Sequence, residues 1–269
     1  MSKSKGNVID PLVVMDEHGT DALRFTLAAL AAQGRDIKLS EERILGYRRF
    51  VNKIWNAARF VFMNLDDNET APSKTPPATL ADRWILTRMG EVSGQVARAI
   101  DDYQFNEAAG LCYQFVWHEF CDWYLEMAKQ ELYGEDQIQK DAARNTVLEA
   151  LGASLKLLHP FMPFVTEEIW QRLPGTNGSI MSARFPDPAD FPKDEEALKD
   201  MTLLMGIITG IRNIRGEMNL PPSKNVSVVI DASDSETAAR IGNNSGHLKI
   251  LAKVNDLDVG TGQIGRAHV

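Results

Sequence analysis

The residues of this sequence whose types could do chemistry lie in its first quarter. Residues 1–7 combine serine hydroxyls with the ammonium groups of Lys3 and Lys5. Ammonium and hydroxyl donors stabilise negative charge on phosphate oxygens, and Gly6 suits a segment that must move over a ligand. A short lysine- and serine-rich segment is also common in disordered N-termini. Residues 1–7 therefore do not decide alone between phosphate chemistry and a solvated terminus.

A second group of donors shares one face of a helix that the sequence predicts over residues 41–65. Apolar side chains recur there at steps of three and four, as in a helix stripe that faces a core. The stripe comprises Ile44, Tyr47, Val51, Ile54, Trp55, Ala58, Phe62 and Leu65. Another face carries Arg49, Asn52, Lys53, Asn56, Arg59 and Phe60. Cations contact phosphates, amides and guanidinium groups read unpaired bases, and an aromatic ring can stack on a base.

The net charge at first opposes a nucleic-acid partner, whereas its distribution favours one. The 269 residues carry a formal net charge of −8, yet eight basic and only three acidic residues lie between Arg24 and Met63. An acidic remainder repels a polyanion elsewhere and directs it to this region. A solvated basic helix face explains the same charges, and Phe60 could equally pack against a neighbouring helix. Both alternatives stay open at this point.

The composition excludes several other classes of protein. With 44% hydrophobic and 25% charged residues, the chain resembles ordinary soluble globular proteins with one large and one small domain. Its longest apolar stretch, residues 201–211, is too short to span a bilayer, and no secretory leader is expected. Cys112 and Cys121 match neither a metal site nor a disulfide framework, so we interpret both as buried. We therefore predict a reduced, cytoplasmic protein without a metal.

Capping residues divide the first part of the chain into helices. Asp10 and Pro11 are predicted to begin a short helix that Gly19 ends. Asp21 is predicted to cap the following helix, and Ser40 to cap the helix that carries the donors. Residues 66–79 contain three prolines and are predicted to be a linker.

The middle of the chain predicts an antiparallel helical bundle. Its helices are expected over residues 80–100, 106–133 with Asn106 as N-cap, 139–158 and, after a proline corner, 166–173. Four tryptophans, at positions 55, 117, 123 and 170, are expected in the core. His118 and His159 are interpreted as structural histidines.

The last part of the chain has a different pattern. A helix is predicted over residues 195–217, followed by strands at residues 226–230 and 256–259 with a helical stretch between them. The predicted fold is therefore mainly α, a helical bundle followed by a small α+β unit whose sheet is expected to be incomplete.

Two short motifs give these features a common context. Residues 1–7 read MSKSKGN, and residues 19–25 read GTDALRF. In this order and spacing they resemble the KMSKS loop, lacking its leading lysine, and the DALR element of class I aminoacyl-tRNA synthetases. Residues 82–86, 120–126 and 159–170 resemble sequences shared by the valine, isoleucine and leucine members of that family.

Other segments resemble the valine branch of this family in particular. They are residues 34–37, residues 52–60, which read NKIWNAARF, and residues 212–222. An isoleucine-type member is expected to carry a cysteine-rich zinc site near its end, and this sequence has no such cluster. The resemblance implies a C-terminal fragment of the valine enzyme. Residues 1–39 would hold the loop and connecting helices, residues 40–185 the anticodon-binding bundle, and residues 186–269 the α+β unit.

The resemblance also implies roles for individual residues. Lys3 corresponds to the second lysine of the loop and is the implied catalytic residue. ATP phosphates would be bound by Ser2, Lys3, Ser4 and Lys5, with ATP and Mg acting in the full-length enzyme. The implied tRNA-binding residues are Arg24, Arg43, Arg48, Arg49, Asn52, Lys53, Asn56, Arg59 and Phe60.

The sequence also lacks parts that the family uses for catalysis. No His-x-Gly-His tetrapeptide occurs in it, no alternating β–α pattern precedes the loop, and no inserted editing domain is present. We therefore expect the chain to bind tRNA as a monomer, without a bound cofactor and without catalysing aminoacylation in the absence of its catalytic domain. The alternatives are the same fragment of an isoleucine or leucine enzyme, a stand-alone tRNA-binding paralogue, or a helical scaffold that binds proteins.

Overall fold

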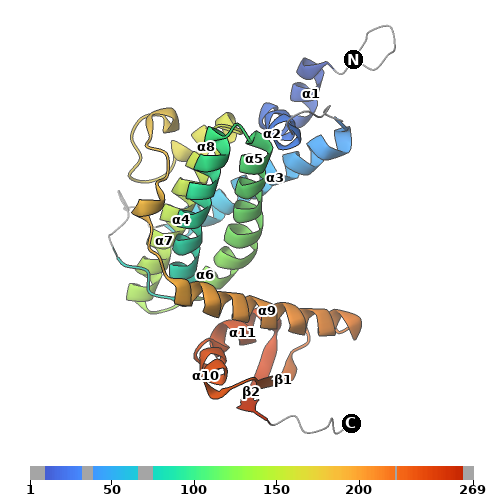
Figure 1. Ribbon diagram of the computed structural model, residues 1–269, viewed down its shortest axis with the longest axis vertical. Coiled ribbons are helices and arrows are strands. Elements are labelled where there is room, and N and C mark those ends of the chain that lie inside the picture. The colour runs from blue at the N-terminus through green and yellow to red at the C-terminus, as the bar shows by residue number, and fades with distance from the viewer. Residues whose placement is uncertain (1–9, 32–38, 66–74, 222, 263–269) are drawn as a thin grey trace. The chain divides into compact units, whose positions relative to one another are not determined.

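The computed structural model describes residues 10–31, 39–65, 75–221 and 223–262. Contacts divide the chain into two compact units, Met1–Lys193 and Asp194–Val269, and each is described by itself. The first unit is helical, and the second combines helices with a two-stranded sheet (Figure 1). This confirms the predicted fold class, whereas the three-part division of the chain stays a prediction.

The first two helices meet at a glycine. Asp10 caps α1 (Pro11–His18), because its Oδ1 accepts a hydrogen bond of 2.9 Å from the N–H of Leu12. Gly19, with φ of 91°, ends α1 and begins α2 (Thr20–Leu30). A positive φ is accessible to glycine at little cost, so the chain turns here without strain.

The predicted role of Asp21 is wrong. Its carboxylate does not cap α2 but accepts hydrogen bonds from the backbone N–H groups of Phe164 and Val165, at 3.2 and 2.7 Å. These amides belong to the first turn of α8 (Pro163–Trp170). Because Gly19 occupies the N-cap position of α2, Asp21 lies inside that helix and is buried against the start of α8 instead.

Helix α3 (Glu41–Met63) confirms the predicted donor-bearing helix, with Ser40 at its N-cap position. The Ser40 side chain makes no capping hydrogen bond, so only the position was predicted correctly. The buried side chains of α3 are Ile44, Phe50, Ile54, Ala57, Ala58 and Val61. The predicted stripe missed Phe50 and Val61 and included residues that stay partly exposed, such as Trp55. The buried face is therefore rotated relative to the predicted one.

Five further helical segments complete the bundle. They are α4 (Leu80–Asp101), α5 (Phe105–Tyr113), the π-helix η2 (Gln114–Tyr124), α6 (Leu125–Leu132) and α7 (Gln137–Leu158). Helix α4 packs against α5 and α7, and α6 packs against α7 (Figure 1). The connecting segment before Asp194 holds two 3₁₀ turns, η3 (Ile180–Ser182) and η4 (Pro188–Asp190).

Two details of the predicted bundle are corrected. Gln104 rather than Asn106 precedes the first residue of α5. The expected core tryptophans, Trp55, Trp117, Trp123 and Trp170, are only partly buried, whereas Trp84 is 3% exposed. His118 fits the structural role predicted for it, since its Nδ1 lies 3.4 Å from the Asp122 carboxylate while half of its side chain is accessible. Large rings with a polar atom commonly lie at the margin of a core, where that atom can reach a partner. Cys112 and Cys121 are buried free thiols, as predicted.

The second unit begins with α9 (Glu195–Glu217). Strands β1 (Val226–Ala232) and β2 (Val254–Thr261) pair in parallel, and α10 (Ser235–Asn243) and α11 (Ser245–Ala252) form the crossover. Residues of β1 alternate between partly buried and exposed, which matches the alternating sequence pattern from which the strand was predicted.

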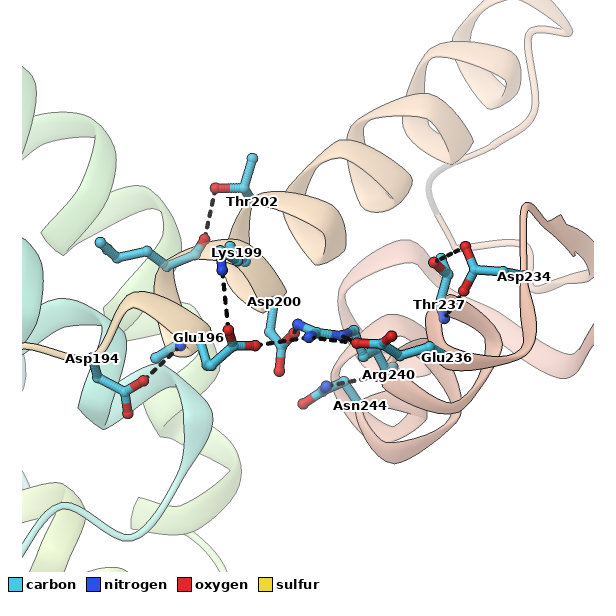
Figure 2. A network of polar contacts seen from close by, with 12 residues as sticks. Asp194, Glu196, Lys199, Asp200, Thr202, Asp234, Glu236, Thr237, Arg240 and Asn244 are labelled. Atoms are coloured by element: carbon cyan, nitrogen blue, oxygen red, sulfur yellow. Dashed lines mark hydrogen bonds and ion pairs between the residues drawn. The ribbon is translucent and has the colours of Figure 1, made fainter.

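An arginine joins three carboxylates inside this second unit. Arg240 of α10 forms ion pairs with Glu196 at 2.7 Å and Asp200 at 2.5 Å, both on α9, and with Glu236 one turn earlier on its own helix (Figure 2). Asp234 caps α10 by accepting from the N–H of Thr237. Arg240 therefore ties α10 to the first turns of α9.

Within the described ranges, no helix combines the length and the apolar character needed to cross a membrane.

Candidate nucleic-acid interface

The predicted phosphate-binding residues cannot be placed. Ser2, Lys3, Ser4 and Lys5 lie outside the residues that the structure describes. The predicted tRNA-binding residues all lie within the described part, so the candidate site is built from them.

The outer surface of α3 carries four polar side chains that have no partner among the described residues. Arg49, Asn52, Asn56 and Arg59 follow at steps of three and four, so they share one face of the helix. All four are exposed. None of their side chains forms a hydrogen bond or an ion pair with another residue that the structure describes. We call these four residues the α3 donor face.

Lys53, at one margin of this face, is held by other residues. Its Nζ lies 2.5 Å from Oδ1 of Asp122 and 5.1 Å from the centre of the Trp117 ring. Nδ1 of His118 lies 3.4 Å from the other carboxylate oxygen of Asp122. Asp122 therefore offsets much of the Lys53 charge, and this lysine is a weaker candidate for a phosphate contact than the arginines of the α3 donor face.

The π-helix explains why Asp122 and Trp117 reach the same lysine. Residues five apart on an α-helix point roughly 140° away from each other. In a π-helix the backbone hydrogen bonds join residues five apart, so such residues lie one above the other. No feature of the amino-acid sequence indicates η2, and the joint contact of Asp122 and Trp117 with Lys53 was therefore not predicted.

Phe60 lies at the same margin of the α3 donor face. It is partly buried, and the Lys129 ammonium lies 5.7 Å from its ring centre. A cation over the ring face is a favourable contact and covers part of the surface that a base could use. The structure therefore supports packing for one part of the ring while another part stays accessible.

The remaining predicted residues lie on the opposite margin or beyond it. Arg48 donates a hydrogen bond of 3.0 Å to the carbonyl oxygen of Glu17, and Arg24 donates one of 3.1 Å to that of Pro160. Both contacts leave further N–H groups of the guanidinium available, because arginine has five donors. Arg43 is exposed near Tyr47. These arginines are not gathered at one point but lie along α2 and α3.

Groups that could do other chemistry are held in inactive forms. Burial raises the pKa of both the Cys112 and Cys121 thiols to about 12, so neither is a nucleophilic thiolate at neutral pH. Burial also lowers the pKa of His159, whose Nδ1 lies 2.7 Å from the hydroxyl of Thr166. Among the described residues, no cluster of His, Cys, Asp and Glu could hold a metal ion.

Comparison with known families fits this helical architecture. Residues 82–230 match the family described as the anticodon-binding domain of tRNA ligase, and residues 1–40 match class I tRNA synthetases (I, L, M and V). Because the first match covers more than half of the chain, the chain belongs to the anticodon-binding domain family of tRNA ligases.

Curated relatives of high identity are valine–tRNA ligases. That of Syntrophotalea carbinolica is 53% identical over 97% of this chain and 29% of its own length. That of Geobacter sulfurreducens is 53% identical over 97% of this chain and 30% of its own length, and one from Bacillus cereus is 45% identical with the same shares. The chain therefore spans less than a third of the length of these relatives.

A solved structure shares the fold. The ternary complex of Agrobacterium radiobacter K84 agnB2 LeuRS with tRNA and LeuAMS matches 71% of this chain and 22% of its own chain. The TM-score is 0.54 and the identity 22%, so the likeness concerns the fold alone.

Proposed function

We propose that the α3 donor face binds the anticodon arm of tRNA, and that the chain is the tRNA-binding part of a valine–tRNA ligase. The single observation that carries the proposal is the set of exposed donors that have no partner in the part of the chain that the structure describes, on a chain of net charge −8 that belongs to an anticodon-binding family. Arg49 and Arg59 would contact phosphates, while Asn52 and Asn56 would read the edges of unpaired bases.

The activity of the longer protein is part of the same proposal. It would activate valine with ATP and Mg as the adenylate and transfer it to tRNA, with Lys3 stabilising charge on the α-phosphate. Identity of 53% to two valine–tRNA ligases supports valine over isoleucine or leucine. We propose that the present chain binds tRNA as a cytoplasmic monomer and needs the catalytic domain for any reaction.

Filter binding with tRNA transcripts tests the proposal. The chain should prefer valine tRNA to other tRNAs, and log Kd should rise linearly with log salt concentration, as expected when phosphates are neutralised. Arg49→Glu should weaken binding at least tenfold, because it replaces a phosphate contact with a repulsive charge. Arg98→Glu on α4 is the matched control, an exposed helical arginine outside the face, and should change affinity much less. If the two variants weakened tRNA binding equally, the binding site would not be the α3 donor face.

Base reading is tested separately from phosphate contact. Asn56→Ala should reduce the preference for valine tRNA while leaving the salt dependence unchanged, because an amide neutralises no phosphate. If it lowered the affinity for all tRNAs equally, Asn56 would be a backbone contact rather than a reader of bases.

A further inference from the structure

Three lysines of the second unit gather where its two parallel strands begin. Lys224 lies two residues before the start of β1, and Lys253 immediately precedes β2. Because the strands are parallel, these ends lie side by side, and the N–H of Val226 donates a hydrogen bond of 3.1 Å to the carbonyl oxygen of Lys253. Lys249 lies one turn before Lys253 on α11, since its carbonyl oxygen accepts from the N–H of Lys253. We call Lys224, Lys249 and Lys253 the lysine patch.

Two arginines of α9 fix the segments that carry these lysines. Arg212 donates two hydrogen bonds to the carbonyl oxygen of Leu251, at 3.0 and 3.2 Å. Arg215 donates to the carbonyl oxygens of Pro221, at 3.1 Å, and Lys253, at 3.4 Å. Helix α11 also packs against α9 and β2 (Figure 1). The lysine patch therefore belongs to a folded surface whose backbone is held from several sides.

The ammonium groups of the lysine patch are available to a ligand. All three lysines are exposed, and none forms a hydrogen bond or an ion pair with another residue that the structure describes. Residues 209–225 and 245–254 together contain five lysines and arginines, and Glu217 is their one acidic residue. On α9, Glu217 points roughly 140° away from Arg212 and roughly 160° away from Arg215, so its carboxylate lies on another face of the helix.

The other carboxylates of this unit leave the field of the lysine patch positive. Asp256 of β2 lies at its margin, where it accepts hydrogen bonds from a serine and an asparagine side chain. Asp231 and Asp258 lie farther along the strands. Glu196, in the first turn of α9, lies about 24 Å from Arg212 at 1.5 Å per residue, well beyond the screening length of about 8 Å at physiological salt. Three ammonium groups therefore face solvent beside a single carboxylate.

We propose that the lysine patch binds phosphates of an RNA backbone, as a second contact beside that of the α3 donor face. An ammonium group is a compact charge with three donors, which suits a phosphate and reads no base. The match to the anticodon-binding domain family extends over residues 82–230 and so includes α9 and Lys224, which favours RNA over an acidic protein as the polyanion.

The inference rests on the proposed function and extends RNA binding to the second unit. A contact with phosphates positions the RNA without specifying its sequence, so its loss weakens all tRNAs alike. The α3 donor face would discriminate between tRNAs, and the lysine patch would add affinity that decreases with salt.

Replacing the three lysines by glutamine tests the lysine patch. The triple variant Lys224→Gln, Lys249→Gln, Lys253→Gln should keep the melting temperature of the unaltered chain, because these exposed side chains have no partner among the described residues. In the filter assay it should bind valine tRNA and other tRNAs about tenfold more weakly, and the slope of log Kd against log salt should fall by about two to three.

Single variants give a comparison at equal charge. Lys253→Gln alone should lower the salt slope by about one. Lys199→Gln is the matched control, because it removes the same charge from an exposed lysine near the start of α9 that is paired with Glu196. It should leave both affinity and slope unchanged. A change of the same size in Lys199→Gln and Lys253→Gln would overturn the inference.

The outcomes separate this inference from the proposed function. If the unaltered chain binds tRNA and the triple variant keeps its affinity and salt slope, the lysine patch is overturned and the proposed function stands. If the triple variant loses affinity while Arg49→Glu does not, the lysine patch stands and the site on α3 fails.

A chain that binds no tRNA at all would overturn the proposed function, and NMR titration with a short RNA duplex would then decide about the lysine patch. Shifts of the amides of residues 224–226 and 249–254 that vanish in the triple variant support it. The absence of such shifts in the unaltered chain overturns it.

Discussion

Glu131 gives the sharpest prediction about stability. This glutamate of α6 is 7% exposed, and burial raises its pKa from an ordinary 4.5 to about 7, with the nearby Asp82 carboxylate adding to the shift. Asp82 is itself fixed by hydrogen bonds from the hydroxyl of Tyr124, at 2.8 Å, and from the N–H of Thr79. The folded protein therefore prefers Glu131 protonated, whereas the unfolded chain loses that proton near pH 4.5.

The sign and size of the effect follow from proton linkage. Between pH 4.5 and about 7 the folded state holds one more proton at Glu131 than the unfolded state, so the free energy of unfolding falls as pH rises. Each pH unit in this window costs about 1.4 kcal/mol, or about 3 kcal/mol in all. Above pH 7 this cost stays constant, and below pH 4.5 it vanishes.

Glu131→Gln removes the titrating group while keeping its shape. The free energy of unfolding is measured by urea unfolding, followed by circular dichroism, at pH 5, 6, 7 and 8. Relative to the unaltered chain, that of the variant should rise by about 2–3 kcal/mol from pH 5 to pH 8. Glu135→Gln, at an exposed position between α6 and α7, is the control and should show no such trend. A difference between Glu131→Gln and the unaltered chain that stays constant from pH 5 to pH 8 would refute the reasoning.

Three further predictions concern the contacts that hold the helices. Asp21→Ala removes the cap of α8 and should lower the free energy of unfolding by about 1–2 kcal/mol, measured by urea unfolding; no change would mean that the two amide contacts contribute nothing. Asp122→Asn should change stability by less than about 1 kcal/mol, because the ion pair with Lys53 is partly exposed, yet it should strengthen tRNA binding in the filter assay by removing a negative charge beside α3. A weaker complex would contradict the position assigned to that ion pair. Arg240→Met should speed hydrogen exchange in α10 and leave exchange in α7 unchanged, since its three carboxylate partners lie on α9 and α10.

The elements that the sequence predicted best are those whose signals are local. The bounds of α3, α4 and α9 follow from uninterrupted periodicity between a capping residue and a breaker. Both ends of each of these helices were predicted to within about two residues. The α3 donor face could also be predicted from local spacing, because residues at steps of three and four share a face in any α-helix.

The features that the sequence did not reveal depend on partners far along the chain. Asp21 looks like a cap for its own helix, and only the fold brings α8 close enough to take its carboxylate. The π-helix η2 has an ordinary helical sequence, so the joint contact of Trp117 and Asp122 with Lys53 could not be predicted.

One physical rule explains the different roles of the cations on α3. Where a cation lies beside a carboxylate, as Lys53 does beside Asp122, its field is largely cancelled and it holds the fold together. Where cations lack such a partner, as Arg49 and Arg59 do within the described residues, their field extends into solvent. On a chain with net charge −8, such arginines are places where a polyanion would meet least repulsion. The acidic net charge is therefore compatible with the proposed RNA-binding role of the α3 donor face.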